Sequence, residues 1–233
     1  MTPWSVVSGE KQNCRMDFIA ATRDHIPNPR NFFILPSEDA HDATAIHSQW
    51  PSARIAGIEQ DTKVFEHIEA KHLNVHIEHM TMRKYVDRMA LYPNGVEFDS
   101  AFIDYTGMLT RQRLHEVCKF VAFGTKPKSV VALTFQKSAR SKYEQVRDLV
   151  SDLSWLEDID SDDVAINDGS GWNKAEYVAD TVAGAIESGF DGVPAQRARL
   201  KRLDILQARE YQATTTSACM YFIVLLIERQ TRA

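Results

Sequence analysis

The stretch NFFILPSEDAHDATAIHSQWPSARIAGIEQD, residues 31–61, decides the fold of this chain. Residues 31–35 are apolar on both faces, which is typical of a parallel strand covered by helices on each side. Residues 39–47 carry alanine and isoleucine at helical spacing, and residues 54–58 form a second apolar run. A proline follows both the first strand and the helix. The order strand, loop, helix, strand predicts one nucleotide-binding half of an α/β sheet.

Glu59 follows the second predicted strand directly, at the end where open parallel sheets bind ligands. A carboxylate in this place can accept both hydrogen bonds of a ribose diol. The alternative is a solvated side chain that only happens to follow a strand. The position within the pattern indicates Glu59 as a candidate ribose ligand.

The order of these elements, ending in Gly57-Ile58-Glu59, resembles the cofactor half of class I S-adenosylmethionine-dependent methyltransferases. The resemblance covers most of residues 28–230 and implies S-adenosylmethionine as the cofactor. In place of the family's glycine-rich loop, this chain has Leu35-Pro36-Ser37-Glu38-Asp39. Glycine suits such a loop because the backbone approaches the cofactor closely and can need a positive φ. The two acidic residues of the loop would repel the phosphates of a dinucleotide, which favours S-adenosylmethionine over a dinucleotide.

The rest of the chain continues the alternation of strands and helices, which implies a parallel sheet. The periodicity predicts helices at 62–69, 82–91, 114–123, 137–153 and 173–188, and strands at 74–80, 98–104, 128–135, 203–211 and 218–228. We predict a doubly wound α/β fold with a mostly parallel seven-stranded sheet and a C-terminal antiparallel hairpin. Residues 1–233 form a single domain in this interpretation, with a covering segment at 1–30 and an insertion or lid at 154–195.

Asp104 ends the central predicted strand, and Asp104-Tyr105-Thr106-Gly107 leads into a loop where the resemblance places the reactive centre. This sequence keeps the acid and the aromatic residue of the signature of amino-methylating nucleic-acid enzymes, but it lacks both prolines. Asp104 either lines the site, where it would orient the acceptor or take its proton, or caps the next helix. Tyr105 either stacks on an acceptor or belongs to the core.

The resemblance implies a set of cofactor-binding residues at the carboxyl ends of the strands: Pro36, Ser37, Glu59, Gln60, Met80, Thr81 and Asp104. It implies an acceptor site at residues 104–106, with Asp104 and Tyr105 as the candidate catalytic residues. It also places an N-terminal helix over the cofactor, so residues 8–11 are expected at the rim of its site.

The composition predicts a single globular domain and argues against a disulfide-rich or membrane-spanning protein. The chain has 233 residues, of which 44% are hydrophobic, so a single globular domain is expected. Three widely separated cysteines predict no disulfide framework and a reducing compartment, and we expect a cytoplasmic protein. The longest apolar run, 218–227, is too short to span a bilayer. The histidines at 72, 76 and 79 and the acidic run at 157–163 do not match zinc or calcium sites, so no metal is predicted.

The formal net charge of −5 argues against a surface that coats nucleic acid, although two basic clusters occur. The clusters consist of Lys137, Arg140, Lys142 and Arg147, and of Arg197, Arg199, Lys201 and Arg202. They are either solvated faces or a nucleic-acid track. The leading prediction is an S-adenosylmethionine-dependent methyltransferase whose acceptor is open, with nucleic acid favoured. The alternative is a catalytically inactive member of the fold that serves as a nucleic-acid- or protein-binding regulatory module.

Overall fold

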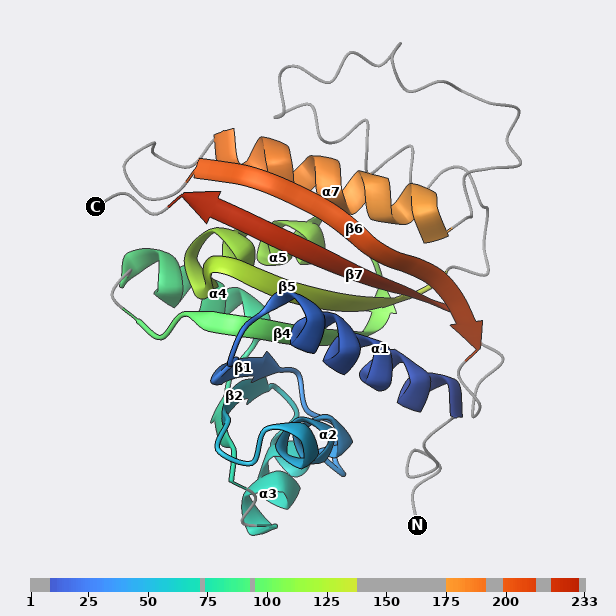
Figure 1. Ribbon diagram of the computed structural model, residues 1–233. Helices are drawn as coiled ribbons and strands as arrows, with labels where there is room; N and C mark the ends of the chain where they lie inside the picture. The colour runs from blue at the N-terminus through green and yellow to red at the C-terminus, as the bar shows by residue number, and fades with distance from the viewer. Residues whose placement is uncertain are drawn as a thin grey trace.

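One seven-stranded sheet runs through the computed structural model, which describes residues 9–71, 74–92, 95–137, 175–191, 199–212 and 219–230 (Figure 1). In spatial order its strands are β3 (His76–His79), β2 (Arg54–Glu59), β1 (Asn31–Ile34), β4 (Phe98–Met108), β5 (Thr125–Gln136), β7 (Cys219–Gln230) and β6 (Arg199–Gln212). The strands from β3 to β5 are parallel, and β7 pairs antiparallel with both β5 and β6. The predicted α/β sheet with its C-terminal antiparallel hairpin is confirmed.

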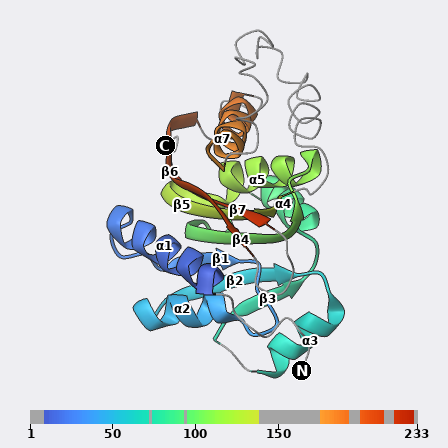
Figure 2. The same ribbon diagram turned by 90° about the vertical axis from the view of Figure 1, so that its right-hand side faces the viewer.

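Helices cover both faces of the sheet (Figure 2). One face packs against α1 (Gly9–His25) and α2 (His41–Gln49), and the other against α4 (Met82–Leu91), α5 (Arg111–Gly124) and α7 (Ala175–Asp191). The short helix α3 (Thr62–Ala70) packs against β2 and β3. Because both faces are covered, the central strands have apolar side chains on both sides, which explains the continuous apolar runs in the sequence.

The segment predicted as an insertion or lid, residues 154–195, is described only at α7. The side chains of Val178, Val182 and Ile186 on this helix are buried in the core, against α5 and the strands. The helix therefore belongs to the covering layer of the sheet. Residues 154–174 and 192–195 lie outside the described part of the chain, as do residues 138–153 of the helix predicted at 137–153.

The order in which the chain adds strands to the sheet reverses between β1 and β4, although the two strands are parallel. From β1 the chain builds outward to β2 and β3, then returns through α4 to place β4 on the other side of β1. At such a reversal the loops at the carboxyl ends of the two strands diverge and leave a crevice, where open α/β sheets bind ligands.

No helix in the described ranges is both long and apolar enough to cross a membrane.

Gly57 allows β1 and β2 to approach each other beside this crevice. A Cβ atom at Gly57 would lie 2.5 Å from the carbonyl oxygen of Ile34, its partner in the ladder. Any side chain at this position would force the backbone of β1 away, since the clashing atom is main chain. The glycine before Ile58-Glu59 is thus required by strand packing.

Candidate functional site

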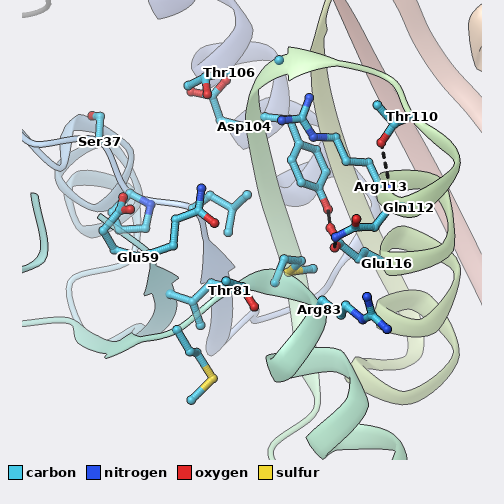
Figure 3. A pocket seen from close by; sticks show the side chains of 18 of the residues that line it. Ser37, Glu59, Thr81, Arg83, Asp104, Thr106, Thr110, Gln112, Arg113 and Glu116 are labelled. Atoms are coloured by element: carbon cyan, nitrogen blue, oxygen red, sulfur yellow. Dashed lines mark hydrogen bonds between the residues drawn. The ribbon is translucent and has the colours of Figure 1, made fainter. Parts of the chain in front are cut away.

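A cavity of about 740 Å³ opens at the carboxyl ends of β1, β2 and β4 (Figure 3). The structure brings together around it every residue that the sequence nominated for the cofactor and the acceptor: Pro36, Ser37, Glu59, Gln60, Met80, Thr81, Asp104, Tyr105 and Thr106. Lys11 of α1 also lines it, within the segment expected at the rim. The assignment of these residues to ligand binding stays a prediction, but their convergence defines one candidate site.

The loop after β1 reaches the cavity without glycine. The backbone N–H of Leu35 donates to the carbonyl of Phe102 at 3.2 Å, which prolongs the pairing of β1 with β4. The N–H of Ala40 then donates to the carbonyl of Ser37 at 2.8 Å, and Ala40 takes the left-handed conformation with φ of 47°. The positive φ that glycine would supply is therefore present, but an alanine adopts it.

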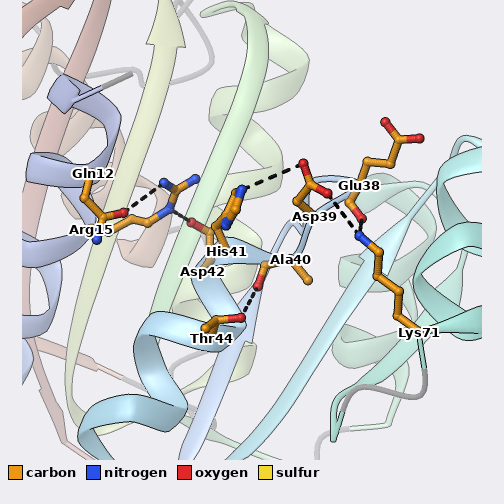
Figure 4. Close-up of polar contacts among 9 residues, drawn as sticks. All are labelled: Gln12, Arg15, Glu38, Asp39, Ala40, His41, Asp42, Thr44 and Lys71. Atoms are coloured by element: carbon orange, nitrogen blue, oxygen red, sulfur yellow. Dashed lines mark hydrogen bonds and ion pairs between the residues drawn. The ribbon is translucent and has the colours of Figure 1, made fainter. Parts of the chain in front are cut away.

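Ion pairs hold this loop and the start of α2 from two sides (Figure 4). On one side, the Nζ of Lys71 donates to the carbonyl of Glu38 at 2.9 Å and to the carboxylate of Asp39 at 3.0 Å. The hydrogen bond from Lys71 lowers the pKa of Asp39. On the other side, the buried guanidinium of Arg15 on α1 pairs with the buried carboxylate of Asp42. These contacts fix the path of the loop where the fold would normally use glycine.

Two polar groups on this side of the cavity suit a bound nucleoside. Ser37 lines the cavity, and its hydroxyl oxygen is buried with no hydrogen-bond partner among the described residues. The Oε1 atom of Glu59 accepts from the N–H of Asp61 at 2.6 Å. This bond orients the carboxylate and leaves its second oxygen available to a ribose hydroxyl. The residues present therefore fit an adenosine-containing cofactor.

A backbone hydrogen bond joins the carboxyl ends of β2 and β3 on the same side of the cavity. The N–H of Met80 donates to the carbonyl of Glu59 at 3.0 Å, and Thr81 caps α4 by accepting from the N–H of Lys84 at 3.3 Å. Met80 and Thr81 are thereby held beside Glu59 by the backbone itself. Their position relative to Glu59 follows from the parallel register, in which Glu59 lies opposite His79.

Asp104 lies at the centre of the site and is almost fully buried. Its carboxylate forms an ion pair with the ammonium of Lys11 and accepts a hydrogen bond from the hydroxyl of Thr134. Burial raises the pKa of Asp104, but the charge and hydrogen bond of Lys11, aided by Thr134, outweigh burial and lower it. Thr110, not Asp104, caps the next helix, so the capping alternative for Asp104 is wrong.

Tyr105 belongs to the core and to the cavity wall at once. Its ring stacks on Phe135 at 5.5 Å, and its hydroxyl donates to Oε2 of the buried Glu116 at 3.1 Å. Burial and the neighbouring carboxylate of Glu116 raise the pKa of Tyr105 well above its usual value. The phenol therefore stays protonated at neutral pH and cannot act as a general base there.

The sequence did not reveal a second group of residues that lines the cavity opposite Ser37 and Glu59 (Figure 3). The group consists of Arg83 on α4 and Gln112, Arg113 and Glu116 on α5. The helix predicted from the sequence began at residue 114, so residues 112 and 113 were not assigned to it, whereas α5 begins at Arg111. A helical pattern also cannot show that this part of α5 faces the carboxyl ends of the strands. That relationship depends on the packing of α5 over the sheet.

The basic clusters do not converge on this site in the described part of the chain. Lys137 lies at the carboxyl end of β5, where its Nζ pairs with Glu210 at 2.7 Å. Lys201 and Arg202 lie at the start of β6, and the ladder through Glu228 places them beside the start of β5, at the opposite edge of the sheet. Arg140, Lys142, Arg147 and Arg197 lie outside the described residues, and the side chain of Arg199 is likewise not described.

Metal ligands do not gather in the described ranges, where no group of three or more histidine, cysteine or acidic side chains could hold an ion. The predicted acidic run at 157–163 and His72 lie outside those ranges. His79 contacts the carbonyl of Gln60 at 3.2 Å and stacks on Phe65. Its role in the structure is thus local packing.

No protein-family model and no curated protein sequence matches the chain. Solved structures do match it. The O-methyltransferase from Bacillus cereus in complex with SAH aligns with a TM-score of 0.53 and 13% identity, over 97% of this chain and 84% of that one. A proposed O-methyltransferase from Klebsiella pneumoniae aligns with a TM-score of 0.52 and 11% identity, over 97% and 83%. TYW2 from P. horikoshii in complex with MeSAdo aligns with a TM-score of 0.50 and 10% identity, over 97% and 66%. The chain therefore has the class I methyltransferase fold, as the resemblance at residues 31–61 predicted.

Proposed function

We propose that this chain is an S-adenosylmethionine-dependent methyltransferase. The observation that carries the proposal is one cavity between β1 and β4, which Ser37, Glu59 and Asp104 line together. The described complexes of this fold with SAH and MeSAdo support an adenosine-containing ligand in such a cavity. Fold alone does not establish activity, so the argument rests on these side chains.

In this proposal Glu59 accepts the hydrogen bonds of the ribose, and Met80 and Thr81 lie beside the adenine. Asp104 and Lys11 lie toward the methionine part, where their opposite charges complement its ammonium and carboxylate groups. When bound, the cofactor supplies a methyl group on a positively charged sulfur. Methyl transfer of this kind depends mainly on alignment and proximity.

The side chains of the site agree with catalysis by alignment. Asp104 has a lowered pKa and is already paired with Lys11 and Thr134, so it is a weak base. Tyr105 stays protonated. We propose that these two residues orient the acceptor and exclude water. The proton that the acceptor atom loses then passes to solvent or to a basic group of the acceptor molecule.

The runner-up is a non-catalytic module of the same fold. Two observations favour it: Lys11 already pairs with Asp104 inside the cavity, and the loop at 35–40 contains no glycine. In that case the cavity would not bind the cofactor, and the surface would serve a partner. The same measurement separates both functions.

Titration calorimetry of the full chain with S-adenosylmethionine, and separately with S-adenosylhomocysteine, tests the proposal. We expect micromolar affinity for at least one of them, followed by methyl transfer in a screen of acceptors. Absence of heat at several temperatures, together with an unchanged melting temperature at millimolar ligand, would reject the methyltransferase and favour the module. The basic clusters give no track to the site in the described residues, so the acceptor class needs another argument.

A further inference from the structure

The two sides of the cavity carry opposite charge (Figure 3). Glu59 lies on the side formed by β1 and β2, and Arg83 and Arg113 lie on the side formed by α4 and α5. A cationic cofactor suits the first side. The second side has an excess of positive charge that no part of such a cofactor requires.

Arg113 is held in place by groups that do not neutralise it. Its Nη1 donates to the carbonyl of Met108 at 2.5 Å, and its Cζ lies 5.0 Å from the ring centroid of Tyr105. It forms no ion pair with any carboxylate of the described residues. Both oxygens of the adjacent Glu116 are engaged, since Oε2 accepts from Tyr105 and Oε1 from Gln112 at 2.9 Å. The guanidinium is thus oriented in advance, and its charge has no dedicated protein partner.

Gly107 makes room for this guanidinium. A Cβ atom at Gly107 would lie 2.5 Å from Nη1 and 2.7 Å from Nη2 of Arg113. The clash would involve only the far end of a flexible side chain. A small residue at this position therefore serves the placement of Arg113 and not the path of the backbone.

A second cavity, of about 590 Å³, adjoins the first along α4 and α5 and shares Arg83, Gln112 and Glu116 with it. Its wall adds Arg111 and Lys119, and Lys119 pairs with Asp87 at 2.7 Å. Among the described residues that line the two cavities on this side, cations outnumber carboxylates. A volume of this size lies within the range of about 300–1,000 Å³ found for small-molecule sites.

We infer that the acceptor is a small molecule bearing an oxyanion, a phosphate or a carboxylate, which Arg113 binds with the assistance of Arg83. The fork of a guanidinium matches both anions through paired hydrogen bonds. Calling this molecule the acceptor rests on the proposed function. The anion site itself does not, because it is formed by α4, α5 and the loop after β4.

Saturation-transfer NMR on the full chain tests the site with three probes of similar shape: phenyl phosphate, benzoate and the uncharged benzyl alcohol. We expect one or both anions to bind more tightly than benzyl alcohol. Arg113→Gln should lower the affinity for that anion by about tenfold or more, which is the effect of losing a charge-assisted hydrogen bond. Preference for phenyl phosphate or for benzoate then identifies the anionic group of the acceptor.

Lys201→Gln removes one exposed positive charge at the opposite edge of the sheet and is the matched control. Gly107→Ala should displace the guanidinium of Arg113 and lower the affinity for the anion, while the melting temperature stays unchanged. This variant replaces Arg113→Gln if Arg113→Gln does not fold. Equal affinities for wild type and Arg113→Gln, or equal binding of benzyl alcohol and the anions, would overturn the inference.

Calorimetry with S-adenosylhomocysteine on the same samples separates this inference from the proposed function. Anion binding that depends on Arg113 without any binding of S-adenosylhomocysteine would support the anion site and reject the methyltransferase. Binding of S-adenosylhomocysteine without binding of either anion would overturn the anion site and leave the methyltransferase standing.

Discussion

Lys11 on α1 forms an ion pair with Asp104 in the second half of β4, and both residues line the same cavity. The pair joins the N-terminal helix directly to the candidate site. Asp104 is far more buried than Lys11, with 6% of its side chain exposed against 28%. Loss of the lysine would therefore leave a buried carboxylate without its main countercharge, whereas loss of the aspartate would leave a cation that can reach water.

Lys11→Met should lower the free energy of unfolding by about 3 kcal/mol at pH 7, the usual cost of removing one partner of a buried pair. Urea unfolding followed by circular dichroism measures it. Lys63→Met removes an exposed lysine from α3 and should cost much less. Equal losses in the two variants would show that the pair with Asp104 does not stabilise the fold.

The same carboxylate predicts a dependence of stability on pH. Because the pKa of Asp104 is lowered in the folded state, its stabilising contribution is present above the unfolded pKa of about 3.9 and is lost as pH falls through the folded value. The stability difference between wild type and Asp104→Asn should therefore shrink below about pH 3.9. Urea midpoints measured from pH 7 to pH 2 test this, and a difference that stays constant would exclude the carboxylate as its source.

Glu59→Ala should weaken binding of S-adenosylhomocysteine by at least about tenfold. It should leave the fold intact, because the one hydrogen bond that it removes within the protein, from the N–H of Asp61, is exposed. Calorimetry measures the affinity, and the melting temperature reports the fold. Glu66→Ala, which removes an exposed carboxylate from the neighbouring α3, is the matched control and should bind as wild type does. Unchanged affinity in Glu59→Ala would remove this residue from the site.

Gly57→Ala should destabilise the protein by about 1–3 kcal/mol, since the added methyl group would meet the backbone carbonyl of Ile34 at 2.5 Å. Gly184→Ala in α7 makes the same chemical change where no atom of the described residues lies within 4 Å of the new Cβ. That variant should be more stable by up to about 1 kcal/mol, as expected for a helix interior. Thermal unfolding of both variants measures the contrast, which would vanish if Gly57 were not packed against β1.

Local sequence patterns were sufficient to predict most helices and strands and the residues on one side of the cavity. Apolar runs of strand length and helical stripes depend on neighbouring residues only, so the alternation of β and α segments could be read directly. The carboxyl ends of parallel strands share one edge of a sheet, so the sequence alone predicts that Ser37, Glu59 and Asp104 lie close together. The prediction of an insertion or lid at 154–195 used composition, and composition does not show which face a helix such as α7 buries.

By itself the sequence determined the order of the strands along the chain, the class of fold and the place of Glu59 at the end of β2, because period and burial are properties of short segments. The predicted end of the central strand at Asp104 was wrong, since β4 continues to Met108. The tertiary structure alone decided that Lys11 meets Asp104, that Ala40 takes a positive φ in place of glycine, and that Arg113 faces Glu59 across one cavity. These relationships join segments that are distant in sequence, and they follow from how each helix packs on the sheet. Packing of this kind depends on the whole core, so no local pattern in the chain encodes it.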